Sequence, residues 1–186
     1  MVLIEIASPP TDPPTADEVR ALYAAASGRP PLHEPPSTAA LFASLYASSL
    51  RGQDVTVATA RDGGRLVGFA YGHPWRWAEQ RDPWADQLRA RLGEDAAAQL
   101  DGAFALNLLA RDPDEHYRGL GRQVLDRWLR AVAPGSCWLQ TTDVDSPARR
   151  VYEAVGFAPV GHGPDAPDGR PGLVLLLPTA PGPERS

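Results

Sequence analysis

The segment 112–130, DPDEHYRGLGRQVLDRWLR, places Gly119 and Gly121 beside Arg118 and Arg122 at the start of an amphipathic helix. Backbone N–H groups at a helix start have no partner within the helix, and the helix dipole makes that end positive. Glycines let an anion approach these amides closely, and arginines add charge-assisted contacts. The pattern therefore predicts a phosphate-binding loop. A Gly-x-Gly pair is also typical of a plain helix entry, so the rest of the chain has to decide.

Composition excludes several other kinds of phosphate or nucleotide site. All 18 basic residues are arginine, so a Walker-type loop and Schiff-base chemistry are both excluded. Val124 occupies the position where the dinucleotide fingerprint has its third small residue. The net charge of −5 and the absence of a basic stripe argue against nucleic acid as a partner. The single cysteine, Cys137, lies in a strand-like run and is expected to be a core thiol, so no cysteine-based metal site is expected.

Length and hydropathy predict one domain over residues 1–178 that is not associated with a membrane. The start of the chain, MVLIEIASPP, lacks a basic leader and a cleavage pattern, so a cytoplasmic location is the default expectation. The last residues, 179–186, are expected to form a disordered tail.

The elements that must position the loop follow from hydrophobic spacing and turn residues. We expect a strand at 2–7, helices near 15–27 and 37–50, and a hairpin whose turn spans 61–64. The second of these helices carries Leu41, Leu45, Tyr46 and Leu50 on its apolar face. Residues 76–102 read as a helical insertion between strands, with Trp84 expected to pack against Leu88 and Leu92.

The second half of the chain alternates strands and helices. We expect a buried strand at 103–110, then the helix after the glycines, then a strand at 137–142. A further helix begins with Asp145 or Ser146 as its cap and ends at Gly156, and two antiparallel strands flank the loop 162–171. The order predicts an α/β or α+β fold with a mixed central sheet flanked by helices.

Two motifs in this half resemble those of the GCN5-related N-acetyltransferase (GNAT) family, which transfers acetyl groups from acetyl-CoA to amines. The family's pyrophosphate loop resembles RDPDEHYRGLG, through Pro113, Gly119 and Gly121. A second family helix resembles DSPARRVYEAVGF, through Ala148, Tyr152, Gly156 and Phe157. The resemblance covers roughly residues 103–160. It implies the GNAT fold, acetyl-CoA as cosubstrate, no metal, and an amine acceptor that is a small molecule or a peptide.

The resemblance also implies roles for individual residues. Tyr152 corresponds to the tyrosine that protonates the leaving thiolate, although its helical spacing is also that of a core residue. A backbone amide near Leu109, where the family's strand bulges, stabilises the oxyanion, and the main chain from Leu109 through Ala110 to Arg111 pairs with the pantetheine arm. The expected coenzyme-binding loop comprises His116, Tyr117, Arg118, Gly119, Leu120, Gly121 and Arg122, together with Ser146 at the next helix start.

The proton acceptor and the amine site are less defined. His116 replaces the family's usual Arg or Gln, and Asp145 or Ser146 replaces its Asn; a capping Asp145 would leave Ser146 facing the coenzyme. Asn107 occupies the strand position where many relatives carry glutamate, so it would orient a water, while His73 and Glu34 are alternative bases. Glu34, His73 and Trp75 are the candidate acceptor-binding residues.

Two further points stay open at this level. The tryptophans of the insertion can line an apolar acceptor pocket or pin its helices to the sheet. A second function is a non-catalytic acyl-CoA sensor or interaction domain that has lost its base. The sequence also leaves open whether the chain is a monomer or a homodimer.

Overall fold

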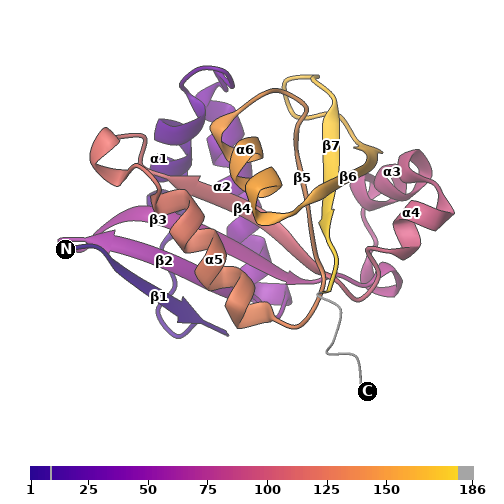
Figure 1. Ribbon diagram of the computed structural model, residues 1–186, viewed down its shortest axis with the longest axis horizontal. Helices are drawn as coiled ribbons and strands as arrows, with labels where there is room; N and C mark the ends of the chain where they lie inside the picture. Colours follow the sequence, from indigo (N-terminus) through magenta and orange to yellow (C-terminus); the bar gives the residue numbers. More distant parts are fainter. Residues whose placement is uncertain (9, 180–186) are drawn as a thin grey trace.

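One seven-stranded sheet organises the computed structural model, which describes residues 1–8 and 10–179 (Figure 1). Its spatial order is β1-β2-β3-β4-β5-β7-β6, and every neighbouring pair is antiparallel except β4 and β5. The strands are β1 Leu3–Ala7, β2 Thr56–Asp62, β3 Arg65–Pro74, β4 Phe104–Arg111, β5 Cys137–Thr142, β6 Ala158–Gly163 and β7 Gly172–Leu177.

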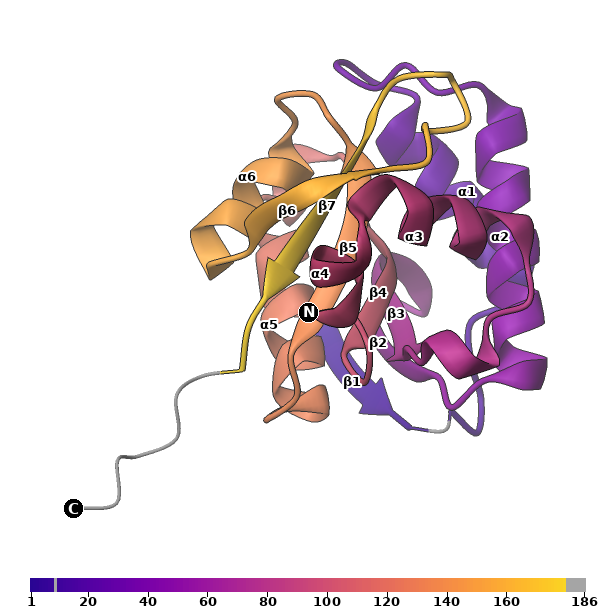
Figure 2. The same ribbon diagram turned by 90° about the vertical axis from the view of Figure 1, so that its right-hand side faces the viewer.

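Helices cover both faces of this sheet. They are α1 Ala16–Ser27, α2 Pro36–Gly52, α3 Pro83–Leu92, α4 Glu94–Ala98, α5 Leu120–Val132 and α6 Pro147–Val155, with short 3-10 turns at Trp77–Glu79 and Glu115–Tyr117. Figure 2 shows α5 and α6 on one side of the sheet and α1 and α2 on the other, with α3 and α4 beside the β6 end. The mixed α/β architecture predicted from the sequence is confirmed.

Local sequence signals explain where these elements start and stop. Thr15 and Glu18 form a reciprocal capping box at the start of α1. Gly63 and Gly64, with φ of 56° and 84°, make the tight turn between β2 and β3 that the hairpin pattern predicted. Gly156 ends α6 with φ of 111°, a left-handed conformation that favours glycine.

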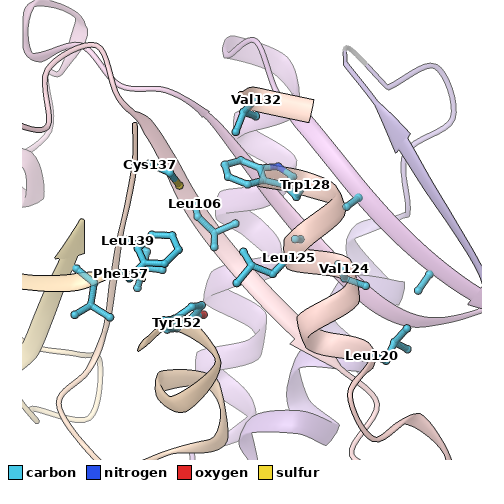
Figure 3. Close-up of a cluster of buried hydrophobic side chains, with 14 of the residues drawn as sticks. Leu106, Leu120, Val124, Leu125, Trp128, Val132, Cys137, Leu139, Tyr152 and Phe157 are labelled. Carbon is cyan, nitrogen blue, oxygen red and sulfur yellow. The ribbon is translucent and has the colours of Figure 1, made fainter. Parts of the chain in front are cut away.

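The main core lies between the sheet and α5 (Figure 3). Val124, Leu125 and Trp128 of α5 are completely buried, as their spacing predicted, and the helix packs mainly against β2, β3 and β4. The Trp128 indole N–H also donates to the carbonyl of Thr56 at 2.9 Å. A Cβ at Gly72 would lie 2.6 Å from that indole and 2.1 Å from the Ala105 carbonyl oxygen, so β3 tolerates only glycine there.

The predicted buried face of α2 is confirmed at Tyr46, which is fully buried, and at Leu50, which packs against the same cluster. It is wrong at Leu41 and Leu45, which are 45% and 48% exposed. Beside Tyr46 the helix buries Thr38, Ala39 and Ala43. Small residues along one stripe let an alanine-rich helix approach its neighbours closely, and the stripe ends at Tyr46, whose ring packs edge-on against two aromatic rings of β3. Trp84 is also less buried than expected: it is 39% exposed, while Leu88 beneath it is fully buried.

Two properties of the described residues bear on function. None of their helices is both long and apolar enough to cross a bilayer. Within the same residues, no group of His, Cys, Asp and Glu side chains is arranged to hold a metal ion. The predicted tail at 179–186 lies outside the described residues except for its first residue.

Candidate active site

β4 and β5 are paired over only two residues and then separate. Phe104 pairs with Cys137 and Ala105 with Trp138, and no later residue of β4 pairs with β5. Residues Leu106 to Arg111 therefore present one edge of their main chain without a strand partner, although β3 pairs with the other edge. This is where the sequence predicted that Leu109, Ala110 and Arg111 would offer main-chain groups to the coenzyme.

A bulge sits in the same stretch of β4. Tyr71 pairs with Leu108 and Gly72 with Leu106, so Asn107 is the extra residue between them. The family resemblance suggested a bulge near Leu109; the structure has it two residues earlier. Because the bulge turns the Asn107 side chain outward, that residue is exposed although its strand lies in the middle of the sheet.

The glycine-rich loop follows β4 and offers four unpaired amides. Gly119 caps α5 with φ of 82°, and the N–H groups of Gly119, Leu120, Gly121 and Arg122 donate to no described residue. Nothing lies within 4 Å of a Cβ built on Gly119, and a Cβ on Gly121 would meet only the Arg111 side chain, at 3.8 Å. The unpaired amides predicted at this helix start are therefore present, and together with the N-terminal dipole of α5 they favour an anion, whose binding stays a prediction.

The charged side chains of the loop are engaged locally. Arg118 pairs with Glu115, and the Arg122 Nε lies 2.8 Å from an Asp126 carboxylate oxygen. The His116 ring is exposed and packs edge-on against a tyrosine ring, 5.0 Å between centroids. The backbone of the loop is therefore better placed to receive an anion than its arginines, which would first have to leave their carboxylates.

Tyr117 and Leu120 hold the loop in position. The Tyr117 hydroxyl donates to Asp62 at 3.0 Å and accepts from Arg65 at 3.1 Å, and the Leu120 side chain is buried in the main core. Arg111 donates to the carbonyls of Asp112 and Asp114. The contacts of the Tyr117, Leu120 and Arg111 side chains therefore fix the shape of the loop.

Tyr152 reaches the gap between β4 and β5 from α6. Its side chain is 6% exposed, and its ring packs edge-on against Phe157. In Figure 3 its oxygen points away from α6 toward the strand that carries Leu106. No hydrogen bond from a described residue reaches that hydroxyl, and burial, with a smaller effect of Cys137, raises the pKa of the phenol above its ordinary value of 10. Burial likewise raises the pKa of the Cys137 thiol, as expected for an inert core cysteine.

The cap of α6 is Ser146 and not Asp145. The Ser146 hydroxyl accepts from the Arg149 N–H at 3.1 Å and is buried, while exposed Asp145 forms an ion pair with Arg150 at 2.8 Å. The arrangement in which Asp145 caps the helix and Ser146 faces the ligand is therefore wrong. The short Ser146 side chain can accept a hydrogen bond from its own helix and still be buried. An aspartate at the same buried position would place a carboxylate away from water, which is unfavourable without a cationic partner.

Asn107, predicted to orient a water, is in contact with His73, one of the two predicted bases. The His73 Nδ1 lies 2.9 Å from the carbonyl oxygen of Pro74, so it carries the proton, and Nε2 accepts from the Asn107 amide at 3.3 Å. Burial raises the pKa of Tyr71 to about 12, while Ser49 and Asn107 act in the opposite direction on its hydroxyl. Sequence reasoning missed Tyr71, because a strand pattern does not tell a buried tyrosine whose hydroxyl has polar neighbours from one that only fills a core.

Trp75 lies apart from this group. It is 6% exposed and packs edge-on against Trp138 at 5.0 Å and against Trp77 at 5.2 Å. Its indole N–H has no partner among the described residues, and neither has that of Trp138. The structure thus places Trp75 in the core that joins the insertion to β5.

Glu34 lies in the loop between α1 and α2. Its carboxylate accepts a hydrogen bond of 2.7 Å from the Tyr23 hydroxyl. Sequence reasoning missed a polar role for Tyr23, which lies in the helix expected near 15–27. The two residues are eleven positions apart across a proline-rich loop, so no local pattern links them. The one available signal for a polar role was the choice of tyrosine at a position where leucine or phenylalanine would fill a core equally well.

Comparison with known proteins shows the family of this chain and solved structures with a similar fold. The model of the acetyltransferase (GNAT) family matches residues 17–157. No curated protein matches the chain in a sequence search. A Desulfovibrio desulfuricans protein described as a GNAT-family acetyltransferase has a similar structure, with a TM-score of 0.64, 20% identity, and coverage of 97% of this chain and 100% of its own.

Two other solved structures carry names that differ in their acceptors. The aminoglycoside 6'-N-acetyltransferase from Enterococcus faecium has a TM-score of 0.62 at 15% identity, with 98% of this chain and 99% of its own covered. A Corynebacterium glutamicum protein described as histone acetyltransferase HPA2 and related acetyltransferase has a TM-score of 0.59 at 20% identity, with 96% and 98% covered. At these identities the likeness establishes the fold alone.

Proposed function

The chain belongs to the GNAT family of acetyltransferases, and on that premise we propose that it is an N-acetyltransferase that moves an acetyl group from acetyl-CoA to a primary amine of a small molecule or peptide. The observation that carries this proposal is the gap between β4 and β5. Three features support the proposal: the free main-chain edge of β4, the buried Tyr152 hydroxyl on α6, and the unpaired amides of the glycine loop that follows β4.

Main-chain groups would do most of the coenzyme binding. The amides of Gly119 to Arg122 would hold the pyrophosphate, and the free edge of β4 through Leu109, Ala110 and Arg111 would pair with the pantetheine amides as an added strand would. An amide near the Asn107 bulge or at Leu109 would stabilise the oxyanion that forms when the amine attacks the thioester. Ser146 would contribute indirectly, by capping the helix that carries Tyr152.

Tyr152 would act as the general acid. Its burial keeps the phenol protonated at neutral pH, and a phenol with a raised pKa can still donate to a thiolate whose own pKa is roughly 8.5. The absence of a competing hydrogen bond from the described residues leaves the hydroxyl proton available for the sulfur.

The amine must lose a proton before or during its attack. Asn107 cannot accept a proton, but it touches His73 and could fix a water between that histidine and the acceptor. His73 would then receive the proton on Nε2, because Nδ1 is already committed to the Pro74 carbonyl. An acyl-CoA sensor without turnover is the second candidate. It is favoured by the asparagine at this position and by His116 in the glycine loop, and Tyr152 argues against it.

Calorimetric titration with acetyl-CoA, followed by measurement of thiol release with a panel of small amines and amine-bearing peptides, tests the proposal. We expect binding, and thiol release with at least one amine class. Binding with no thiol release across the panel would favour the sensor, and no binding would contradict the assignment of the glycine loop.

A further inference from the structure

Tyr23 and Glu34 form a hydrogen-bonded pair beside the reaction centre. The Tyr23 hydroxyl donates to the Glu34 carboxylate at 2.7 Å, and the Tyr23 ring packs edge-on against Phe42 of α2, 5.0 Å between centroids. Tyr23 also packs against the buried cluster that contains Tyr71 and Leu108, the strand neighbours of the Asn107 bulge. The pair therefore lies on the face of the sheet that α1 and α2 cover, near the Asn107 bulge.

The loop that carries Glu34 is held from two sides. The Glu34 N–H donates to the carbonyl of Ser27 at 3.0 Å. Arg170, in the loop between β6 and β7, donates to the carbonyls of Pro31 and Leu32, at 3.3 Å and 2.7 Å, and forms an ion pair with Asp168. Figures 1 and 2 both show the α1–α2 loop and the β6–β7 loop side by side at the top of the molecule. These contacts hold the loop, and with it the Glu34 carboxylate, in one position.

Among the described residues, Glu34 makes no ion pair. Asp168 and, to a smaller extent, the nearby Glu34 raise the pKa of Arg170, the cation of the neighbouring loop, but its guanidinium is bound to Asp168 and two carbonyls. The side chain is half-buried, and its one protein donor is the neutral Tyr23 hydroxyl. A carboxylate removed from water with a single neutral donor is poorly compensated, so a ligand cation would be bound favourably there.

Tyr23 and Tyr152 pack on opposite faces of the sheet, and they are near enough for Tyr152 to affect the pKa of Tyr23. Burial raises the pKa of Tyr23, then Glu34 does, and Tyr152 also contributes to that rise. Glu34 is nevertheless badly suited to hold the reacting nitrogen itself. A carboxylate favours the protonated form of an amine, and only the neutral form can attack the thioester.

We propose that the Tyr23–Glu34 pair binds a second, protonated amine of the acceptor, so that the preferred substrate is a diamine or longer polyamine and not a monoamine. The inference rests on the proposed acetyl transfer and names the acceptor class for that same site. Arg170 is a positioning residue for the pair, because it fixes the loop without reaching the acceptor.

A matched pair of acceptors, 1,5-diaminopentane and 1-aminopentane, tests this with thiol release. The wild-type protein should prefer the diamine in kcat/KM by about tenfold or more, the worth of one charge-assisted hydrogen bond. In Glu34→Gln the diamine should lose about tenfold, mostly through KM, and the monoamine much less, so the preference disappears. Glu94→Gln removes the same charge on the exposed insertion and should keep the preference. No preference in the wild type, or an equal loss for both amines in Glu34→Gln, would overturn the inference.

A binding measurement separates this inference from the proposed function. If no amine releases thiol, the transferase proposal fails, but calorimetry of the protein saturated with CoA still reports on the pair. The diamine should then bind about tenfold more tightly to the wild type than to Glu34→Gln, and more tightly than the monoamine. Equal binding of the diamine by the two proteins would overturn the assignment of Glu34.

Discussion

Gly121 is a residue that the protein's own packing does not require. An added Cβ would have no neighbour nearer than the Arg111 side chain at 3.8 Å, whereas at Gly72 it would overlap a carbonyl oxygen. Glycine in a helix costs roughly 1 kcal/mol relative to alanine. Because Gly72 is explained by the fold and Gly121 is not, the reason for Gly121 is best sought in a bound molecule.

Gly121→Val should therefore abolish or strongly weaken CoA binding while the protein stays folded. The valine side chain would occupy the space in front of the loop amides, and loss of one or two charge-assisted hydrogen bonds would weaken binding by roughly 100-fold. Calorimetry measures the affinity, and urea unfolding should show a free energy of unfolding within about 1 kcal/mol of the wild type. Unchanged CoA affinity would mean that the loop does not hold the pyrophosphate.

Tyr152→Phe should lower kcat by roughly 100-fold, the usual worth of a general acid, with nearly unchanged affinity for acetyl-CoA. In the wild type, burial holds the pKa of Tyr152 above 10, so the acid is protonated at every lower pH. The rate, corrected for spontaneous hydrolysis, should therefore not fall between pH 8 and 10 through loss of this proton. A descending limb in that range that disappears in Tyr152→Phe would contradict the raised pKa, and an unaffected kcat would remove the acid role.

At the scale of elements, the start of α6 determines where Tyr152 is held. Asp145 and Ser146 are both of a type that can cap a helix. Ser146 is buried and caps α6, whereas Asp145 is exposed and pairs with Arg150. The helix is only nine residues long, so its direction depends strongly on this first turn.

Ser146→Ala should destabilise the protein by about 1 kcal/mol, because the Arg149 N–H would lose its only side-chain acceptor. Asp145→Ala is the matched comparison, since it removes an exposed ion pair one residue away, and it should change the free energy of unfolding less. Urea unfolding of both variants measures the difference. A larger effect for Asp145→Ala would show that the aspartate is the working cap.

At the scale of the whole molecule, the absence of lysine from all 186 residues makes the chain a poor substrate for itself. Arginine remains charged at neutral pH and is not a useful nucleophile. We expect intact-mass spectrometry after prolonged incubation with acetyl-CoA to show no acetyl group on any side chain, the N-terminal amine being the only amine in the chain. Acetylated side chains in the mass spectrum would contradict this expectation. If there are none, thiol release reports only transfer to added acceptors or to water.

Much of this protein follows from local sequence patterns. Helical spacing predicted α5 and its buried face around Trp128, alternation and glycine turns predicted the strands, and the Gly119–Gly121 pair predicted a loop with free amides. These features depend on residues close together in the chain, so dihedral preferences and periodicity are enough to predict them. The exposed face of α2, with Leu41 and Leu45, was not predictable, because an alanine-rich helix has more than one stripe that can be buried.

The tertiary structure alone decided how distant parts meet. The separation of β4 from β5, the contact between Asn107 and His73, and the clamp of Arg170 on the α1–α2 loop join residues up to 139 positions apart. No local pattern encodes such contacts, because they follow from how the sheet closes and from the loops that its order brings together. The sequence by itself determined the two family motifs and the glycine loop, and only the tertiary structure brought the Glu34 carboxylate into hydrogen-bonding distance of Tyr23.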